Sequence, residues 1–178
     1  MLIVEKPPLA RHHHPQRGWN LPELLVVLAL VAWGAQAATT SWQRALSRMQ
    51  ALAARDQLML DLQAARLQAR QSARVLLLQA RTDCAWRQAS ASDWSCGWQL
   101  VDKLDQTTLR TTPLAQGLQV RYTKSVPLEI NERAELGQIG DRWTVQARSS
   151  TSNDAQDAYS ICLSGAGRLR AVMGSTCA

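Results

Sequence analysis

The sequence has few of the side chains on which enzyme active sites depend. Its only histidines are His12, His13 and His14, close to the N-terminus, and no Walker A loop or G-x-G-x-x-G segment occurs. Without a histidine further along the chain, mechanisms that pair a serine or cysteine with an imidazole base are excluded there. Cysteine–histidine clusters with zinc spacing are absent too. We therefore expect a protein that is not an enzyme and that needs no metal or other cofactor.

Carboxylates gather only once, at Glu129, Glu132 and Glu135. Such a cluster offers oxygen ligands to calcium, but the ligand spacing and the glycine of an EF-hand loop are missing. We interpret this segment as a solvated loop.

Glycine and proline are both absent between Ala35 and Cys96, where alanine, leucine, glutamine and arginine favour a helix. We predict that a helix continues from the apolar N-terminal segment to about Arg81, and that its second half packs on a sheet. Apolar residues spaced near 3.6 predict its buried stripe: Leu46, Met49, Ala53, Leu60, Ala64, Leu67, Val75 and Leu78.

Short alternating runs separated by turn residues follow Ser95 and predict strands. The runs are 97–101, 110–114, 118–123, 143–147, 159–163 and 168–172. The sequence thus predicts an α+β fold, in which an antiparallel β-sheet packs on one long N-terminal helix. We divide the chain into a leader (1–18), the membrane-embedded first half of the helix (19–40), the rest of the helix with a connecting loop (41–93), and the sheet with the C-terminal tail (94–178).

The four cysteines fall into two short-range pairs, Cys84 with Cys96 and Cys162 with Cys177. This spacing favours two disulfides formed within the pairs in an oxidising compartment, although four cysteines allow three connectivities.

The N-terminal segment combines a basic leader with an apolar run. From Leu24 to Ala38 only Gln36 is polar. A helix over residues 21–38 would span roughly 27 Å, close to the thickness of a bilayer core, and the leader would stay on the cytoplasmic side. Glu23 at the start of this run is costly in a membrane unless a cation neutralises it. A new N-terminal amine, created by a cut after Gly18, would be such a cation.

Residues 17–28, RGWNLPELLVVL, resemble the prepilin signal of type IV pilins and pseudopilins. The resemblance implies that a prepilin peptidase cuts between Gly18 and Trp19, that Trp19 is N-methylated, and that Glu23 is the carboxylate that guides assembly with other pilins. It also implies a single-pass inner-membrane protein with a periplasmic C-terminal domain, later part of a pilus at the cell surface. Two alternatives are a plain single-pass anchor and a secretory signal that ends at Ala35-Gln36-Ala37 and releases a soluble periplasmic protein.

Two later segments extend the resemblance. Residues 94–102, WSCGWQLVD, and 161–170, ICLSGAGRLR, are similar to segments of the FimT/GspH family of minor pilins and pseudopilins. In that family, a glycine-arginine-any-arginine motif near the C-terminus marks FimT-like pilins that bind DNA for natural transformation. The resemblance therefore implies that Gly167, Arg168 and Arg170 contact double-stranded DNA.

The residues themselves fit this interpretation. Arg168 and Arg170 would share one face of a strand, about 7 Å apart, which is the order of the spacing between successive phosphates. The net charge of +6 suits a polyanion. Further basic contacts would come from Lys103, Lys124, Arg142 and Arg148. Two alternatives stay open: a solvated edge strand, and a GspH-like pseudopilin of type II secretion or a structural minor pilin without DNA binding.

Overall fold

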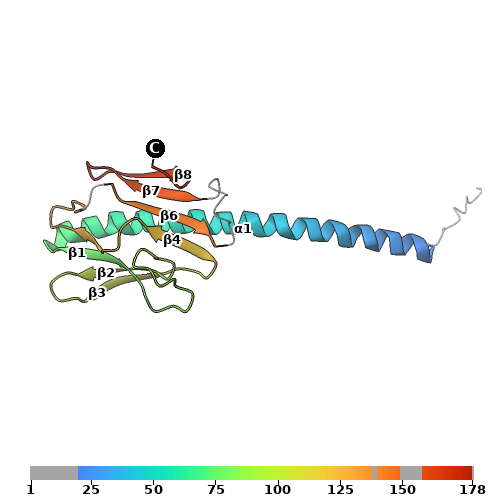
Figure 1. Cartoon of the computed structure of the whole chain (residues 1–178), viewed down its shortest axis with the longest axis horizontal. Helices are drawn as coiled ribbons and strands as arrows, with labels where there is room; N and C mark the ends of the chain where they lie inside the picture. The colour runs from blue at the N-terminus through green and yellow to red at the C-terminus, as the bar shows by residue number, and fades with distance from the viewer. Residues whose placement is uncertain (1–19, 138–139, 149–157, 178) are drawn as a thin grey trace, which may run out of the picture. The chain divides into compact units, whose positions relative to one another are not determined.

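The structure is a computed structural model that describes residues 20–137, 140–148 and 158–177. These residues form one helix, α1 (Leu21–Ser72), and eight strands, as Figure 1 shows. The chain divides into two units, Met1–Ser41 and Trp42–Ala178. The α+β class predicted from the sequence is confirmed.

In the first unit, α1 begins directly after Asn20. The Asn20 carbonyl accepts hydrogen bonds from the backbone N–H groups of Glu23 (2.9 Å) and Leu24 (3.2 Å). The Glu23 carboxylate lies in the first turn, where the helix dipole favours a negative charge. No helix within residues 20–137, 140–148 and 158–177 is long and apolar enough to cross a membrane, so the span predicted over residues 19–40 stays a prediction.

In the second unit, the face of α1 that enters the core differs from the predicted one. Its buried positions are Ala51, Ala54, Leu58, Leu62, Ala65 and Ala69. The predicted stripe was wrong, because Leu46, Met49, Leu60 and Leu67 are exposed. Leucine and alanine recur on two faces of this helix, so a 3.6-residue period fits both. The alanine-rich face is the one that the sheets cover.

The helix ends at Ser72, not near Arg81, and this is a second correction. Ala73 has φ 50, and the Arg74 N–H reaches back to the Ala69 carbonyl at 3.2 Å, which is a Schellman-type end without glycine. Strand β1 (Leu76–Ala80) follows at once. Its leucine run fits a helix and a buried strand equally well, which explains the error.

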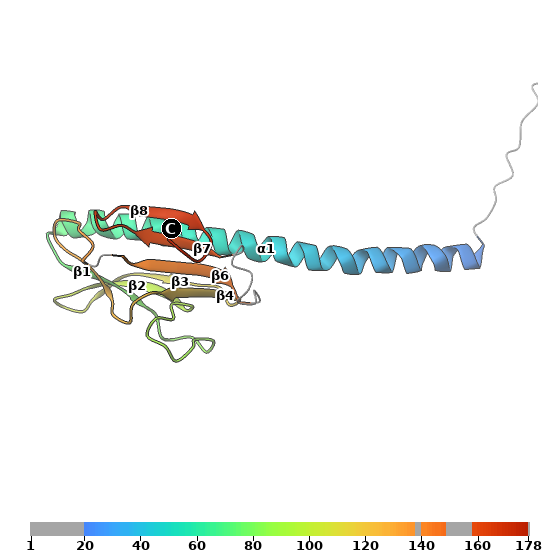
Figure 2. The same cartoon turned by 45° about the horizontal axis from the view of Figure 1, so that its top comes forward.

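The strands form two antiparallel sheets rather than one. Sheet A has the order β3 (Thr108–Pro113), β2 (Gly97–Asp102), β1 and β5 (Leu128–Ile130). Sheet B has the order β4 (Leu118–Tyr122), β6 (Arg142–Ala147), β7 (Tyr159–Leu163) and β8 (Leu169–Met173). All six predicted strands are present within two residues, while β1 and the short β5 were missed. In both views the sheets lie against the second part of α1 (Figures 1 and 2).

The core between α1 and the two sheets is rich in tryptophan. Trp94, Trp98 and Trp143 are buried, and Tyr122 stacks on Trp143 with ring centroids 4.6 Å apart. One buried carboxylate, Asp61, ties the helix to sheet A. It accepts hydrogen bonds from Trp98 Nε1 (2.8 Å), Thr112 Oγ1 (2.7 Å) and Arg110 Nη1 (3.0 Å).

Candidate nucleic-acid interface

The predicted arginine motif lies on the last β-hairpin. Strand β8 pairs with β7, so that Leu169 faces Leu163 and Arg170 faces Cys162. The turn is closed by hydrogen bonds from the Ser164 N–H to the Arg168 carbonyl and from the Gly167 N–H to the Ser164 carbonyl, both 2.9 Å. Strand β8 is also the edge of sheet B. The motif therefore sits at the rim of a sheet.

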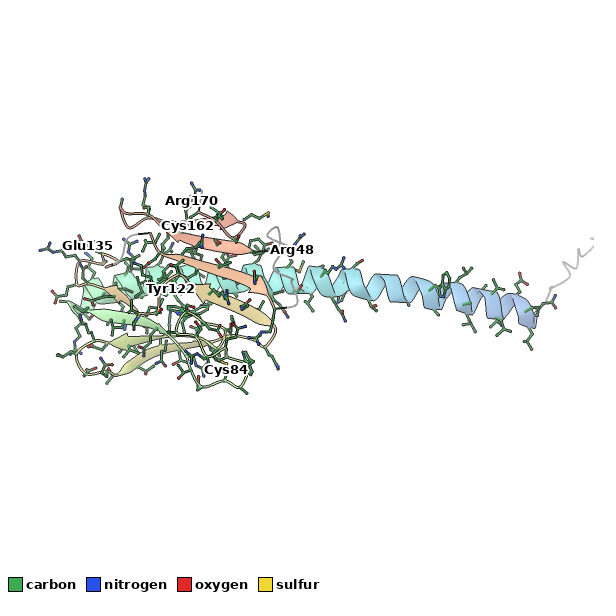
Figure 3. The ribbon with its side chains drawn as sticks, in the orientation of Figure 1. Arg48, Cys84, Tyr122, Glu135, Cys162 and Arg170 are labelled. Carbon is green, nitrogen blue, oxygen red and sulfur yellow. A yellow bond between two sulfur atoms is a disulfide. The ribbon has the colours of Figure 1, made fainter. Side chains whose placement is uncertain are left out.

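The side chains of the motif alternate as the sequence predicts. Leu169 packs against the hydrophobic core, while Arg168 and Arg170 are exposed. Figure 3 shows Arg170 on β8 beside Cys162 of the neighbouring strand. The two guanidinium groups are thus presented to solvent at a sheet edge.

An arginine of α1, Arg66, anchors this hairpin. Arg66 Nη1 donates to the Gly167 carbonyl (3.1 Å), and its Nε donates to the Ala134 carbonyl (2.9 Å). Arg66 is partly buried and joins α1, the hairpin turn and the 131–135 loop. Nothing in the helical pattern distinguishes Arg66 from the arginines around it.

Both predicted disulfides are confirmed, Cys84–Cys96 and Cys162–Cys177, with Cα–Cα distances of 5.7 and 5.8 Å. The second disulfide folds the C-terminal segment back over β7. Ser160 Oγ donates to the Gly174 carbonyl at 2.7 Å, which adds a second attachment. We call residues 174–177 the tail.

A polar groove of about 630 Å³ lies beside the tail. Its lining comes from the β4–β6 region and from the tail: Ser92, Gln119, Arg121, Tyr122, Thr123, Ser125, Arg142, Thr144, Gln146, Ser175 and Thr176. Gln146 Nε2 donates to Gln119 Oε1 at 2.9 Å. Burial raises the pKa of the Tyr122 phenol, and its hydrogen bond to Asp141 acts in the same direction, so the phenol stays neutral. Arg121 was not among the predicted contacts.

The other predicted basic contacts are dispersed. Arg142 lines the groove, and Arg148 follows β6 at the surface. Lys124 Nζ lies 2.9 Å from Asp141 Oδ1. Lys103 Nζ forms an ion pair with Glu129 Oε2 at 2.8 Å, next to sheet A. Among these four residues, Arg142 shares a row across sheet B with Arg170, through Cys162.

The remaining predicted sites are placed as follows. Gly18 and Trp19 lie outside the described residues, and Glu23 belongs to the first unit. Glu129 pairs with Lys103, and Glu135 accepts a hydrogen bond from Asn131 Nδ2 at 2.7 Å. Over the described parts of the chain, no group of three or more metal-ligating side chains occurs.

The fold has counterparts among solved structures, although no protein-family model and no curated protein matches the sequence. The type IV minor pilin FimU of Pseudomonas aeruginosa PAO1 is similar in two crystal forms. One has a TM-score of 0.53 and 21% identity over 68% of this chain and 91% of that chain. The other has a TM-score of 0.54 and 22% identity over 69% of this chain and 88% of that chain. The minor pseudopilin EpsH of the Vibrio cholerae type 2 secretion system is more distant, with a TM-score of 0.49 and 13% identity over 68% and 94%.

The chain therefore has a pilin-like α+β fold. It is similar to the type IV minor pilin FimU at 21–22% identity.

Proposed function

We propose that the protein is a minor pilin-like subunit that assembles with other pilins at the cell envelope. The likeness to FimU supports this role. So does the first unit, where α1 exposes the apolar residues Leu24, Leu25, Val26, Leu28, Leu30, Val31 and Trp33. An apolar helix surface of this kind needs a membrane or other helices to cover it. In the proposal, the inner membrane holds it first and neighbouring pilin helices hold it later.

Processing at the prepilin signal is the first test of this role. Co-expression with a prepilin peptidase should yield a mature N-terminus at Trp19, detected by mass spectrometry of the N-terminal peptide. The Glu23→Gln variant should be cut normally but lose incorporation into filaments, because it no longer neutralises the N-terminal amine of a neighbouring subunit. A mature N-terminus after Ala37 would instead indicate a secretory signal and contradict the proposal.

We further propose that the mature protein binds double-stranded DNA without sequence preference, for uptake in natural transformation. The observation that carries this proposal is the exposure of Arg170 on the edge strand β8 and of Arg168 just before it. Arg66 holds the turn of this hairpin, and the Cys162–Cys177 disulfide holds the segment that follows β8. Arginine forms bidentate hydrogen bonds with phosphate oxygens and keeps its charge at every physiological pH. Two phosphate contacts per subunit give weak, salt-sensitive binding, so several subunits act together.

Fluorescence anisotropy with a labelled duplex, titrated with the full chain in detergent, tests the proposal. Replacing both Arg168 and Arg170 by glutamine should reduce the affinity by roughly eightfold per lost contact at 0.1 M salt. The matched control is the pair Arg70→Gln and Arg133→Gln, which removes the same charge at exposed positions on α1 and in the 131–135 loop. Equal losses in both double variants would show a general charge effect and sink the assigned site. No binding at low salt would leave only the structural role.

A further inference from the structure

The groove and the arginine motif occupy the same face of sheet B, as the strand register shows. Arg142 on β6 faces Cys162 on β7, and Cys162 faces Arg170 on β8. Residues directly opposite each other in antiparallel strands project to the same side. These three positions therefore form one row across the sheet, with Arg142 and Arg170 separated by two strand spacings, or about 10 Å.

Arg121 belongs to the same surface. Arg121 on β4 faces Thr144, two residues along β6 from Arg142. Arg121 and Arg142 are thus diagonal neighbours on the same side, about 7 to 8 Å apart. Their spacing repeats that of the Arg168–Arg170 pair, so the face carries two arginine pairs rather than one.

The chemistry of the groove fits phosphate and sugar. Its lining holds two guanidinium groups, hydroxyls and side-chain amides, and the described residues that line it include no carboxylate. Arg142 Nε is buried and has no hydrogen-bond partner among the described residues. The one aromatic residue of the lining, Tyr122, is buried and stacks on Trp143, so it offers no platform to an unstacked base. Donors without a stacking platform favour the backbone of a duplex over single strands.

The tail lies between the two arginine pairs. Residues 160 and 162 of β7 hold it through the Gly174 carbonyl and the disulfide, while Ser175 and Thr176 form part of the groove wall. Their hydroxyls add neutral donors between the positive ends of the row. A duplex is wide enough to meet both pairs across the tail.

We infer that the groove is a second phosphate-binding site, and that a DNA duplex lies across sheet B from Arg121 and Arg142 to Arg168 and Arg170. This inference rests on the proposed DNA binding and enlarges its surface from two phosphate contacts to about four per subunit. The dependence of affinity on salt counts such contacts, because log K falls with log salt by about 0.9 for each neutralised phosphate of a duplex.

The salt slope therefore tests the inference in the full chain. The wild-type slope should be close to −3.6, and the double variant Arg121→Gln with Arg142→Gln should reduce its magnitude by about 1.8. The double variant of Arg168 and Arg170 should do the same, and the control pair of Arg70 and Arg133 should leave the slope unchanged. Circular dichroism confirms that each variant is folded.

A single isosteric change provides a test that does not depend on replacing Arg142, which is half-buried. Gln119→Glu keeps the Oε1 acceptor for Gln146 and adds a negative charge to the groove. It should weaken duplex binding several-fold, while the same change at the exposed Gln63 of α1 should not.

The outcomes separate the two proposals. If both groove variants keep the wild-type salt slope and affinity while the motif variant binds DNA more weakly, the groove is not a phosphate site and the inference is overturned. The proposal of DNA binding through the motif would then stand. A loss in the groove variants alone would keep the groove and reject the motif. No duplex binding by the wild type would overturn both. Unchanged DNA binding with weakened capture of another pilin would assign the groove to a protein partner and overturn the inference.

Discussion

The two sheets of the C-terminal unit use basic residues differently. Around sheet A they are paired with carboxylates within the chain: Arg74 with Asp102 and Asp105, Lys103 with Glu129, and Arg110 with Asp61. On the outer side of sheet B, Arg121 and Arg142 line a groove whose described residues include no carboxylate. The net charge of +6 therefore does not by itself indicate which basic residues are available to a partner. The basic residues named around sheet A are paired within the fold, while Arg121 and Arg142 of sheet B line a groove and Lys124 beside them pairs with Asp141.

The largest expected loss of stability follows from replacing Asp61, the buried carboxylate that joins α1 to sheet A. Asp61→Ala should lower the free energy of unfolding by about 3 to 5 kcal/mol, because it leaves Trp98 Nε1 buried without its acceptor. Urea denaturation measures the loss. Asp56→Ala, an exposed carboxylate on the same helix, should change stability by no more than about 0.5 kcal/mol. DNA affinity of the folded Asp61 variant should match the wild type, and a marked loss would mean that the two sheets are not separate in function.

The disulfides give the next largest effect and the sharpest contrast. Replacing either pair of cysteines by serine should cost about 3 kcal/mol, because the loops of 12 and 15 residues are similar. Only the Cys162–Cys177 variant should also lose DNA affinity, since it releases the tail from sheet B. Chemical denaturation and anisotropy on the same samples separate the two effects. Equal DNA binding in both variants would contradict the part given to the tail.

Two glycines with positive φ allow a smaller comparison between the sheets. At Gly97 (φ 96), which begins β2 of sheet A, a Cβ atom would press into the Thr112 carbonyl oxygen. At Gly117 (φ 104), just before β4 of sheet B, a Cβ would meet nothing within 4 Å. Gly117→Ala should cost about 1 to 2 kcal/mol from backbone strain alone. Gly97→Ala should cost about 1 to 3 kcal/mol more. Thermal unfolding of both variants checks the difference, and equal costs would contradict tight packing of β2 on β3.

The smallest effect is a dependence on pH at sheet A. The hydrogen bond from Arg74 holds the pKa of Asp102 below its ordinary value of 3.8. A carboxylate with a depressed pKa stabilises the fold above the unfolded pKa, and this contribution is lost as the pH falls through the lower, folded value. Below pH 3.8, the urea midpoint of the wild type should therefore fall more steeply with decreasing pH than the midpoint of Asp102→Asn. Parallel curves would contradict the contribution of this pair, and Asp56→Asn serves as the control.

Much of this architecture was predictable because its signals are local. Strand alternation over residues 143–147 and 159–163 identified β6 and β7, and the helix-forming composition after Ala35 identified α1 but not its end. The short spacing between cysteines identified the disulfides. The Arg168-Leu169-Arg170 alternation gave the exposed pair directly, since a period of two needs no partner strand to be known.

The rest depends on contacts between distant residues. Ala73 ends α1 without glycine, so the sequence gives no signal for the helix end, and β1 was read as helix. The burial of Ala51 and Leu58 instead of Leu46 and Leu60 depends on which face the sheets cover. The groove needs the register of β4 with β6, and Arg121 lies far from the motif in sequence. Arg66 acquires its role only when residues 134 and 167 fold against it.

Under the proposed function, the Cys162–Cys177 disulfide makes part of the DNA-binding surface depend on the compartment in which the chain lies. Cytosolic thiols are kept reduced, while disulfides form after export. A subunit exported as proposed would therefore gain the disulfide between the tail and β7, beside Ser175 and Thr176 of the groove wall, only after it leaves the cytosol. Under the proposed function, the newly made subunit does not carry its finished surface past the cell's own chromosome. It completes that surface where foreign DNA arrives.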